Sequence, residues 1–270
     1  MTATDKAFTG SIPEIYERHL VPLIFEPYAT DMAERLRRIG AAEVLETAAG
    51  TGVVTRAIAA VLPDTAHIVA TDLNEAMLDV ARSSLAHDAR IEWSQADAMA
   101  LPFGDRSFDA VLCQFGVMFF PDKARGFGEA RRVLRQGGSF VFSVWDDIAE
   151  NEFADVVTDA LGQLFPDDPP RFLARTPHGH HDADAIRREL LGAGFGRVEI
   201  DTVRHVSRCA SPHDPAVAYC EGTPLRNEIV ARNPSGPDGA TRHAAEALAR
   251  RFGAGPIEGK IQAIVFTAGR

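Results

Sequence analysis

The stretch VLETAAGTGV, from Val44 to Val53, constrains the fold of this chain more than any other feature of its sequence. A short apolar run ends in Glu46, passes through a loop of small residues, and enters a segment of helical character. Gly50 and Gly52 tolerate positive φ and let a ligand approach the backbone closely. The helix that follows points free N–H groups and its positive dipole end at the loop. This order predicts a pocket for a small ligand with a carboxylate, which the helix end would face, and an ammonium, which Glu46 would face.

Two more segments along the chain, an apolar run and a predicted strand, also end in acids. Asp72 follows the run IVAT, and Asp97 follows a segment that reads as a third strand. An acid at the end of the second strand of a Rossmann-like unit typically holds ribose hydroxyls. Leu73 offers an apolar face to an adenine ring, and Asp97 an acceptor for its exocyclic amine. Three acids at successive strand ends therefore predict one nucleoside site, although each alone also fits a solvated strand end.

The glycine pattern argues against a dinucleotide. The dinucleotide fingerprint needs three glycines, for a tight turn, for the approach of the pyrophosphate and for helix packing. This loop offers only Gly50 and Gly52, and Glu46 would repel a diphosphate. The predicted ligand is a zwitterion.

Five segments in order resemble the motifs of class I S-adenosylmethionine-dependent methyltransferases. They are ETAAGTG (46–52), ATDLNEAML (70–78), QADAMALPF (95–103), FDAVLCQFGVMFF (108–120) and RRVLRQGGSFVFSVW (131–145). The resemblance covers roughly residues 40–146 and is strongest to the small-molecule group with ubiquinone- and menaquinone-type methyltransferases. Ala48 departs from the family pattern, which has glycine there, and we expect alanine to keep a negative φ.

The resemblance implies a role for each site residue. Glu46 would contact the methionine ammonium, Asp72 the ribose hydroxyls, and Asp97 the adenine amine beside the Ala98 N–H. Gln114 would border the reactive methyl group. The predicted cofactor-binding residues are Tyr16, Glu46, Ala48, Gly50, Gly52, Asp72, Leu73, Asp97, Ala98 and Gln114; the cofactor is S-adenosylmethionine, and its product is S-adenosylhomocysteine.

Strands that alternate with helical segments predict an α/β, Rossmann-like, doubly wound and mostly parallel sheet. The resemblance implies seven strands, with the antiparallel last strand between the fifth and the sixth, N-terminal helices, and a helical insertion between the last two strands. We predict a single domain: an N-terminal helical lid (1–40), a cofactor-binding core (41–146), substrate-side helices and the sixth strand (147–208), an insertion or cap (209–257) and the last strand (258–270).

The boundaries of individual elements follow from periodicity and from turn residues. Predicted strands are 43–47, 68–72, 91–95, 108–114, 139–145, 197–208 and 259–268; predicted helices are 11–20, 28–39, 53–61, 75–85, 123–134, 184–192 and 241–252. Ser11 is expected to cap the first helix, and Gly137–Gly138 to form the turn into the fifth strand. The insertion at 209–257 is interpreted either as a cover over the substrate or as a dimerisation or structural element.

The composition limits the classes of partner. A net charge of −10 argues against nucleic acid, whose binding depends on phosphate neutralisation, and against an anionic membrane surface. Three cysteines in 270 residues indicate a reducing compartment. The polar start of the sequence lacks a secretory h-region, and no run approaches the ~20 apolar residues of a membrane span. We expect a cytoplasmic protein with a small-molecule substrate; a homodimer stays open.

Histidines supply the candidate general bases, and the sequence does not choose among His19, His178, His180, His181 and His205. The tract HGHHD (178–182) could be interpreted as a metal site, but its candidate ligands are crowded together and lack a second, separated pair of ligands. A solvated loop or a substrate-lid element is preferred, and no metal is predicted.

The sequence as a whole predicts an enzyme that transfers a methyl group from S-adenosylmethionine to a small, partly apolar acceptor. Transfer to oxygen, nitrogen or carbon is left open, and no catalytic residue is assigned. The alternatives are a non-catalytic cofactor-binding protein and a nucleotide-dependent oxidoreductase.

Overall fold

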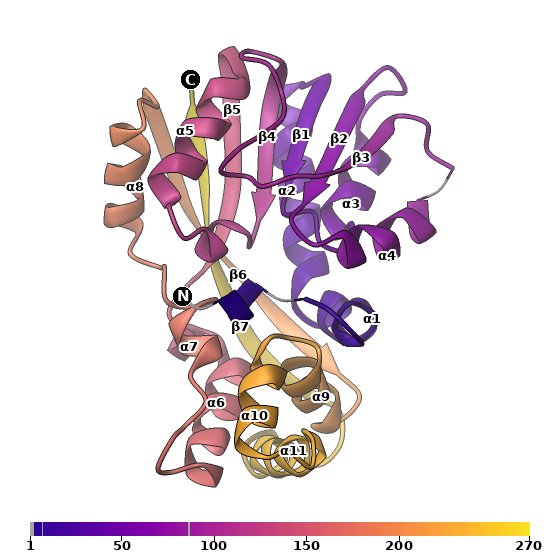
Figure 1. Cartoon of the computed structure of the whole chain (residues 1–270), viewed down its shortest axis with the longest axis vertical. Helices are drawn as coiled ribbons and strands as arrows, with labels where there is room; N and C mark the ends of the chain where they lie inside the picture. Colours follow the sequence, from indigo (N-terminus) through magenta and orange to yellow (C-terminus); the bar gives the residue numbers. More distant parts are fainter. Residues whose placement is uncertain (1–2, 7, 86) are drawn as a thin grey trace. The chain divides into compact units, whose positions relative to one another are not determined.

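The computed structural model describes residues 3–6, 8–85 and 87–270 (Figure 1). The chain folds into two compact units. Unit 1 comprises Met1–Phe25, Trp145–His180 and Arg204–Gln262; unit 2 comprises Glu26–Val144, His181–Val203 and Ala263–Arg270. The predicted single domain and its subdivisions stay a prediction.

A seven-stranded sheet runs in the order β3-β2-β1-β4-β5-β7-β6. Its strands are β1 (Glu43–Thr47), β2 (His67–Asp72), β3 (Ile91–Gln95), β4 (Phe108–Gln114), β5 (Leu134–Trp145), β6 (Arg197–Cys209) and β7 (Ile257–Gly269). The strands β1 to β5 pair in parallel, so that their carboxyl ends lie at one edge of the sheet. In open α/β sheets that edge is where ligands bind.

The last strand, β7, runs against its neighbours. The Arg270 N–H donates to the Gly138 carbonyl near the start of β5, whereas the Asp146 N–H, just after β5, donates to the Gln262 carbonyl. The residue numbers of the two partners change in opposite directions, as they do in an antiparallel pair. Because β7 lies between β5 and β6, the predicted sheet topology is confirmed.

One face of the sheet in unit 2 is covered by two helices. Helix α2 (Glu26–Ile39) and helix α3 (Val53–Val61) pack against each other and share a core cluster with residues of the sheet. Met32 and Leu36 of α2 and Ile58 of α3 are fully buried in this cluster. Apolar residues at helical spacing thus place both helices against the sheet.

Aromatic side chains fill the other face of the same sheet. On β5, Val141 belongs to the core cluster of α2 and α3, whereas its neighbours Phe140 and Phe142 stack on each other with ring centroids 4.7 Å apart. Phe127 of α5 (Lys123–Val133) and Phe266 of β7 contact this pair. The alternation of side chains along a strand explains why successive residues serve two layers.

The other elements of unit 2 connect these layers. They are α4 (Glu75–Leu85), the short 3₁₀ helix η3 (Val117–Phe119) and α8 (Ala183–Gly192). Helix α4 packs along β2 and β3, and α8 packs beside α5 (Figure 1).

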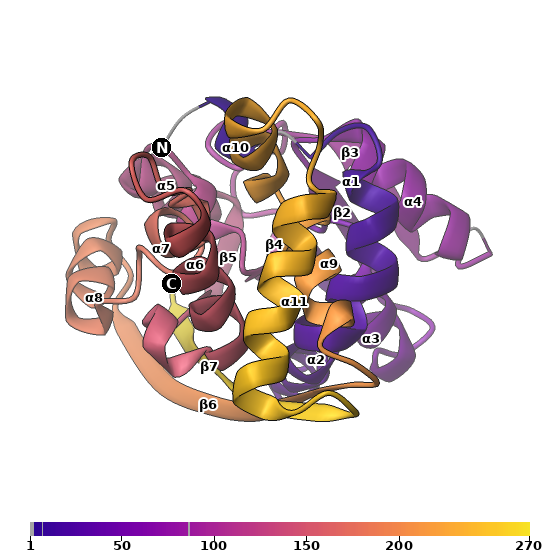
Figure 2. The same ribbon diagram turned by 90° about the horizontal axis from the view of Figure 1, so that it is seen from below.

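Unit 1 is mainly helical. It contains η1 (Ala3–Lys6), α1 (Ile12–Ile15), the π-helix η2 (Tyr16–Phe25), η4 (Ile148–Glu150), α6 (Glu152–Leu164), α7 (Phe172–Arg175), α9 (His213–Glu221), α10 (Leu225–Arg232) and α11 (Asp238–Phe252). Helix α11 lies along α6 and α9, as Figure 2 shows. The predicted helical insertion between the last two strands is confirmed, with three helices (α9 to α11) where periodicity predicts one.

Two boundary predictions are wrong. The N-terminal helices join without the predicted gap, because the chain passes from α1 through η2 directly into α2, and Ser11 makes no side-chain cap bond. Strand β5 begins at Leu134, so Gly137–Gly138 lies inside the strand. Gly137 takes a φ of +80° within the strand, and its N–H donates to the Arg270 carbonyl.

Candidate functional site

The predicted glycine loop joins β1 to α3 in unit 2. Ala48, Gly50 and Gly52 all have positive φ, of +53°, +57° and +83°. The expectation that Ala48 keeps a negative φ is therefore wrong. The backbone here is fixed by longer-range contacts, since the Ala49 N–H donates to the Thr71 carbonyl at 2.9 Å. Alanine accepts a conformation that costs about 1–2 kcal/mol in order to close this turn.

Gly52 is required for a second, steric reason. A Cβ atom at this position would lie 3.1 Å from the Cβ atom of Ala81 on α4 and 3.2 Å from the ring of Trp93 on β3. The close approach of α4 and β3, together with the φ of +83°, therefore disfavours any residue larger than glycine. The sequence predicted the positive φ of this residue, but not these neighbours.

Asp72 lies at the end of β2 and supports the glycine loop directly. Its Oδ2 accepts a hydrogen bond from the Gly50 N–H at 2.9 Å, and its Oδ1 accepts one from the Asn74 N–H at 2.8 Å. Burial raises the pKa of Asp72, and these backbone N–H groups oppose that rise. Asn74 Nδ2 also donates to Oδ1, at 3.4 Å. Each carboxylate oxygen offers two lone-pair sites, so acceptor capacity for a ligand hydroxyl remains at Oδ2.

Glu46 is the more deeply buried carboxyl group, with 1% of its surface exposed against 7% for Asp72. Thr55 of α3 donates its hydroxyl to Glu46 Oε2 at 2.6 Å. Burial raises the pKa of Glu46 to about 8, and the negative charge of Asp72 contributes to the rise. The hydrogen bond from Thr55 and the charge of Arg56 act in the opposite direction and lower this pKa. The ionised form of such a carboxyl group is stabilised when a cation is placed beside it. A ligand ammonium would provide that cation.

The third acid ends the adjacent strand. The Ala96 N–H donates to the Asp72 carbonyl at 3.0 Å, which ties the end of β3 to the end of β2. Asp97 Oδ1 accepts the Met99 N–H at 2.8 Å, and the carboxyl group is only partly buried, as is Ala98. Leu73, beside Asp72, is 43% exposed, which suits an apolar face for a planar ring.

Gln114 ends β4 and is 9% exposed. It pairs in register with Ser143 of β5, at the same edge of the sheet as the three acids. The next residue, Phe115, has a φ of +52°, and its N–H donates to the Ser143 carbonyl. Strained non-glycine residues thus follow both β1 and β4, a feature that often accompanies binding sites.

Unit 2 therefore brings nine of the ten predicted site residues to neighbouring strand ends and the adjoining loops. The tenth, Tyr16, belongs to unit 1, where its ring stacks on that of Phe25 at 5.1 Å. Their contacts with a cofactor stay predictions. Sequence reasoning missed Thr55 and Trp93, because neither belongs to a motif and each reaches the loop through tertiary packing.

The histidine tract HGHHD lies in a loop, as predicted, but the solvated reading is wrong for His178. This side chain is 5% exposed, and its Nδ1 lies 2.9 Å from the Asp146 carbonyl oxygen. The described residues contain no group of three or more His, Cys, Asp or Glu side chains arranged to hold a metal ion. The alternative reading, a substrate-lid element, stays a prediction.

The helices also bear on membrane insertion. Among those that the structure describes, none combines the length and the apolar character needed to cross a bilayer.

Comparisons with known proteins find methyltransferases. A family model described as a methyltransferase domain matches residues 44–138. A demethylmenaquinone methyltransferase from Clavibacter sepedonicus is 47% identical over 98 residues, 36% of this chain but only 39% of that protein. A ubiquinone/menaquinone biosynthesis C-methyltransferase, UbiE, from Escherichia coli is 30% identical over 168 residues, 58% of this chain and 67% of that protein.

A solved structure extends the similarity to the whole fold. Phosphoethanolamine N-methyltransferase 2 from Haemonchus contortus, in complex with S-adenosyl-L-methionine, superposes with a TM-score of 0.61 at 15% identity. The match covers 100% of this chain and 60% of that one. At this identity the likeness concerns the fold alone.

Proposed function

Because the chain belongs to the class I S-adenosylmethionine-dependent methyltransferases, we propose that it methylates a small, partly apolar acceptor. The observation that carries the proposal is the row of three acids at the ends of β1, β2 and β3. Glu46 and Asp72 in this row are both buried, and burial together with the nearby Asp72 charge disfavours the ionised form of Glu46, so the site favours a ligand that brings a positive charge and hydroxyl donors.

In this proposal each part of the cofactor meets one group in unit 2. Glu46 takes the methionine ammonium, and the N-terminus of α3, with Gly50 and Gly52, faces the carboxylate. Asp72 accepts the ribose hydroxyls through the lone pairs that Gly50 and Asn74 leave available. Asp97 and Ala98 meet the adenine edge, Leu73 covers its face, and Gln114 and Ala48 border the methyl-bearing sulfur.

The reaction places modest demands on the protein. The bound cofactor supplies a methyl group on a sulfonium, which is already a good leaving group. The chain aligns the acceptor and excludes water, an effect worth up to ~7–11 kcal/mol in favourable intramolecular cases. Methyl transfer therefore needs a shaped, largely apolar acceptor site more than a large set of charged catalytic groups.

The names of the relatives suggest the first acceptor to try. Demethylmenaquinone is the acceptor named for the Clavibacter protein, and the Escherichia coli protein is named for ubiquinone and menaquinone biosynthesis. A reduced naphthoquinone combines an apolar bicyclic ring with hydroxyl groups and is the natural probe. Tyr16 as a cofactor contact, a cytoplasmic location and a homodimer belong to the proposal as predictions.

The test is the binding of S-adenosylhomocysteine to the full chain after bound nucleosides are removed. At ~100 times its dissociation constant, the ligand should stabilise the wild type by about 2.7 kcal/mol in thermal melts. Glu46→Gln should weaken binding by ~10-fold or more, since a charge-assisted hydrogen bond is worth about 1.5–3 kcal/mol. Glu43→Gln is the matched control, because Glu43 lies on the same strand but is partly exposed.

Four outcomes would contradict the proposal. The first is a wild type that S-adenosylhomocysteine does not stabilise, and the second is equal binding by the two variants. Stabilisation by NADH instead would favour the oxidoreductase alternative. Binding of S-adenosylhomocysteine without transfer of labelled methyl to any acceptor of a broad hydroxyl, amine and quinol panel would favour a non-catalytic cofactor-binding protein.

A further inference from the structure

Glu46 and Asp72 point to the same face of the sheet in unit 2. Glu46 of β1 is in register with Ala70 of β2, and side chains alternate along a strand, so Asp72, two residues after Ala70, shares the face of Glu46. Both side chains are almost completely buried. Two carboxyl groups that share a buried site do not both ionise easily, because each charge disfavours the other. One of the two therefore keeps a proton more readily.

The hydrogen bonds show which of the two keeps it. Asp72 accepts from the backbone N–H groups of Gly50 and Asn74, at 2.9 and 2.8 Å, and from Asn74 Nδ2 at 3.4 Å. Such donors stabilise the ionised form of a carboxyl group. Among the described residues, Thr55 alone donates to the Glu46 carboxyl group, and its hydroxyl can equally accept from a protonated carboxyl group. The bonding thus favours negative charge on Asp72 and a proton on Glu46.

Titratable groups on three neighbouring elements face Glu46. Burial is the largest cause of its pKa of about 8; the charge of Asp72 on β2 adds to the rise, and that of Arg56 on α3 opposes it. Cys113 of β4 adds no charge, because burial raises the pKa of its thiol to about 12. At neutral pH the ligand-free site therefore holds a proton on Glu46.

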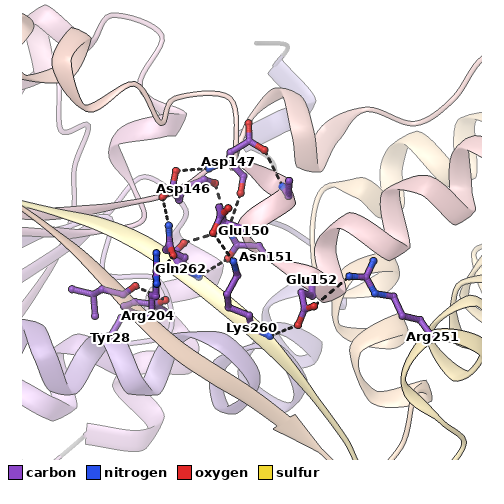
Figure 3. A network of polar contacts seen from close by, with 12 residues as sticks. Tyr28, Asp146, Asp147, Glu150, Asn151, Glu152, Arg204, Arg251, Lys260 and Gln262 are labelled. Carbon is purple, nitrogen blue, oxygen red and sulfur yellow. Dashed lines mark hydrogen bonds and ion pairs between the residues drawn. The ribbon is translucent and has the colours of Figure 1, made fainter.

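Carboxyl groups of unit 1 show the more common way to hold a negative charge (Figure 3). Glu150 pairs with Lys260 Nζ at 2.5 Å, and Glu152 pairs with Arg251 at 3.2 Å. Both carboxylates are partly exposed, and each has a cation from the chain itself. Glu46 is buried more deeply, and the group that donates to it is a hydroxyl. A ligand that brings its own cation would therefore change the protonation of Glu46.

We propose that Glu46 is protonated in the ligand-free site and releases this proton to solvent when the ammonium group of the cofactor binds beside it. The proposal rests on the proposed function. The O–H bond of the carboxyl group breaks, its electron pair stays on the carboxylate, and water or buffer takes the proton. The ammonium group keeps its own protons, so the site exchanges one positive charge for another. Cofactor binding is thereby coupled to pH, and the preference for ligands with an ammonium group grows as pH rises.

Calorimetry in buffers of different ionisation enthalpy counts the protons released when a ligand binds. The first ligand is S-adenosylhomocysteine; the second is methylthioadenosine, which shares the adenosine and the thioether but has no ammonium group. Both are titrated from about pH 5.5 to pH 7.5 into wild type, Glu46→Gln and the control Glu43→Gln, after bound nucleosides are removed. Glu46→Gln keeps the size of the side chain and also reports any proton exchanged by the ligand itself.

We expect wild type and Glu43→Gln to release ~0.9 proton per S-adenosylhomocysteine at pH 7, the protonated fraction of a group whose pKa is about 8. Their affinity for this ligand, and their preference for it over methylthioadenosine, should rise ~10-fold per pH unit. Glu46→Gln should release less than ~0.1 proton and bind with little dependence on pH, because its amide has no proton to lose. Methylthioadenosine should release no proton from any of the three proteins.

Thr55 is a positioning residue in this exchange, and Thr55→Val gives a second measurement. The substitution keeps the shape of the buried side chain and removes the hydroxyl that favours the ionised carboxylate. At about pH 8, wild type should release ~0.5 proton per S-adenosylhomocysteine, and Thr55→Val should release closer to one. A smaller release by Thr55→Val than by wild type would contradict this role.

Binding of S-adenosylhomocysteine to wild type without proton release would overturn the proposal and leave the proposed function standing. Equal proton release by wild type and Glu46→Gln would overturn it as well, since another group would then be the source. Proton release on binding of methylthioadenosine would show that the ammonium group is not the cause. A wild type that does not bind S-adenosylhomocysteine would instead remove the proposed function itself.

Discussion

Replacing Glu46 by Gln should change how the stability of the ligand-free protein depends on pH. In the folded chain the pKa of Glu46 is raised to about 8, from its ordinary value of 4.5. Between these values the unfolded chain has released this proton while the folded chain still holds it. The folded state then binds more protons, and the free energy of unfolding falls as pH rises. Below the lower value both states are protonated, and the carboxyl group carries no penalty.

The size of the effect follows from the span between the two pKa values. A pKa difference of one between the folded and unfolded chains is worth about 1.4 kcal/mol, so burial of this one carboxyl group costs up to ~5 kcal/mol above pH 8 and ~3 kcal/mol at pH 7. Glu46→Gln keeps an acceptor for the Thr55 hydroxyl and has no charge to bury. The variant should therefore gain stability over wild type by ~1.4 kcal/mol per pH unit from about pH 5 to pH 8, with a plateau on either side.

Urea denaturation at closely spaced pH values measures this difference, on protein stripped of bound nucleosides. Glu43→Gln again serves as the control, because its replacement leaves the buried pair of Glu46 and Asp72 intact. Glu43 pairs with His67 near the surface, so the stability of this variant should differ from wild type by no more than the ~1 kcal/mol of an exposed ion pair at any pH. Parallel curves for wild type and Glu46→Gln would refute the reasoning, because the group would then titrate alike in the folded and unfolded chains. A difference that grows toward acid would refute it as well.

Two further predictions concern packing and a buried ion pair. Gly116→Ala should cost about 2 kcal/mol in urea denaturation, because its Cβ atom would lie 2.5 Å from the Cβ atom of Ala48 and 2.7 Å from Cys113 Sγ. Ala48→Gly should be nearly neutral on its own, but combined with Gly116→Ala it should restore more than half of the lost stability. Strictly additive effects of the two substitutions would contradict the clash. Asp5→Ala should cost about 1–2 kcal/mol in thermal melts and speed proteolysis near the N-terminus, because buried Asp5 accepts from Arg175 at 2.6 Å, although the partial exposure of Arg175 limits the loss. Unchanged melting and proteolysis would rule that contribution out.

The sheet and its acids were predictable because the relevant signals are local. Each acid lies at or just after the end of a segment with strand character, and parallel strands that alternate with helices bring their carboxyl ends to one edge whatever the details of packing. The positions of Glu46, Asp72 and Asp97 therefore followed from the pattern along the chain, as did the bounds of β1, β3 and β4.

Local preferences failed where distant parts of the chain impose a geometry. An isolated alanine favours negative φ, but at position 48 the closure of the loop onto Thr71 outweighs that preference. A Gly-Gly pair favours a turn, but at 137–138 hydrogen bonds to Arg270 extend β5 through it. In both cases the deciding partner lies far away in the sequence, where periodicity and propensity carry no information.

The chemistry of the candidate site divides in the same way. Residue types and their spacing were enough to indicate a nucleoside-bearing zwitterion as the ligand and acids as its partners, because charge and hydrogen-bonding capacity belong to the residues themselves. Only the folded chain decides that the Glu46 carboxyl group is buried beside Asp72, and that His178 is the histidine whose ring is oriented by a carbonyl 32 residues earlier. Burial and hydrogen-bond partners depend on which segments pack together, and that is a property of the tertiary structure.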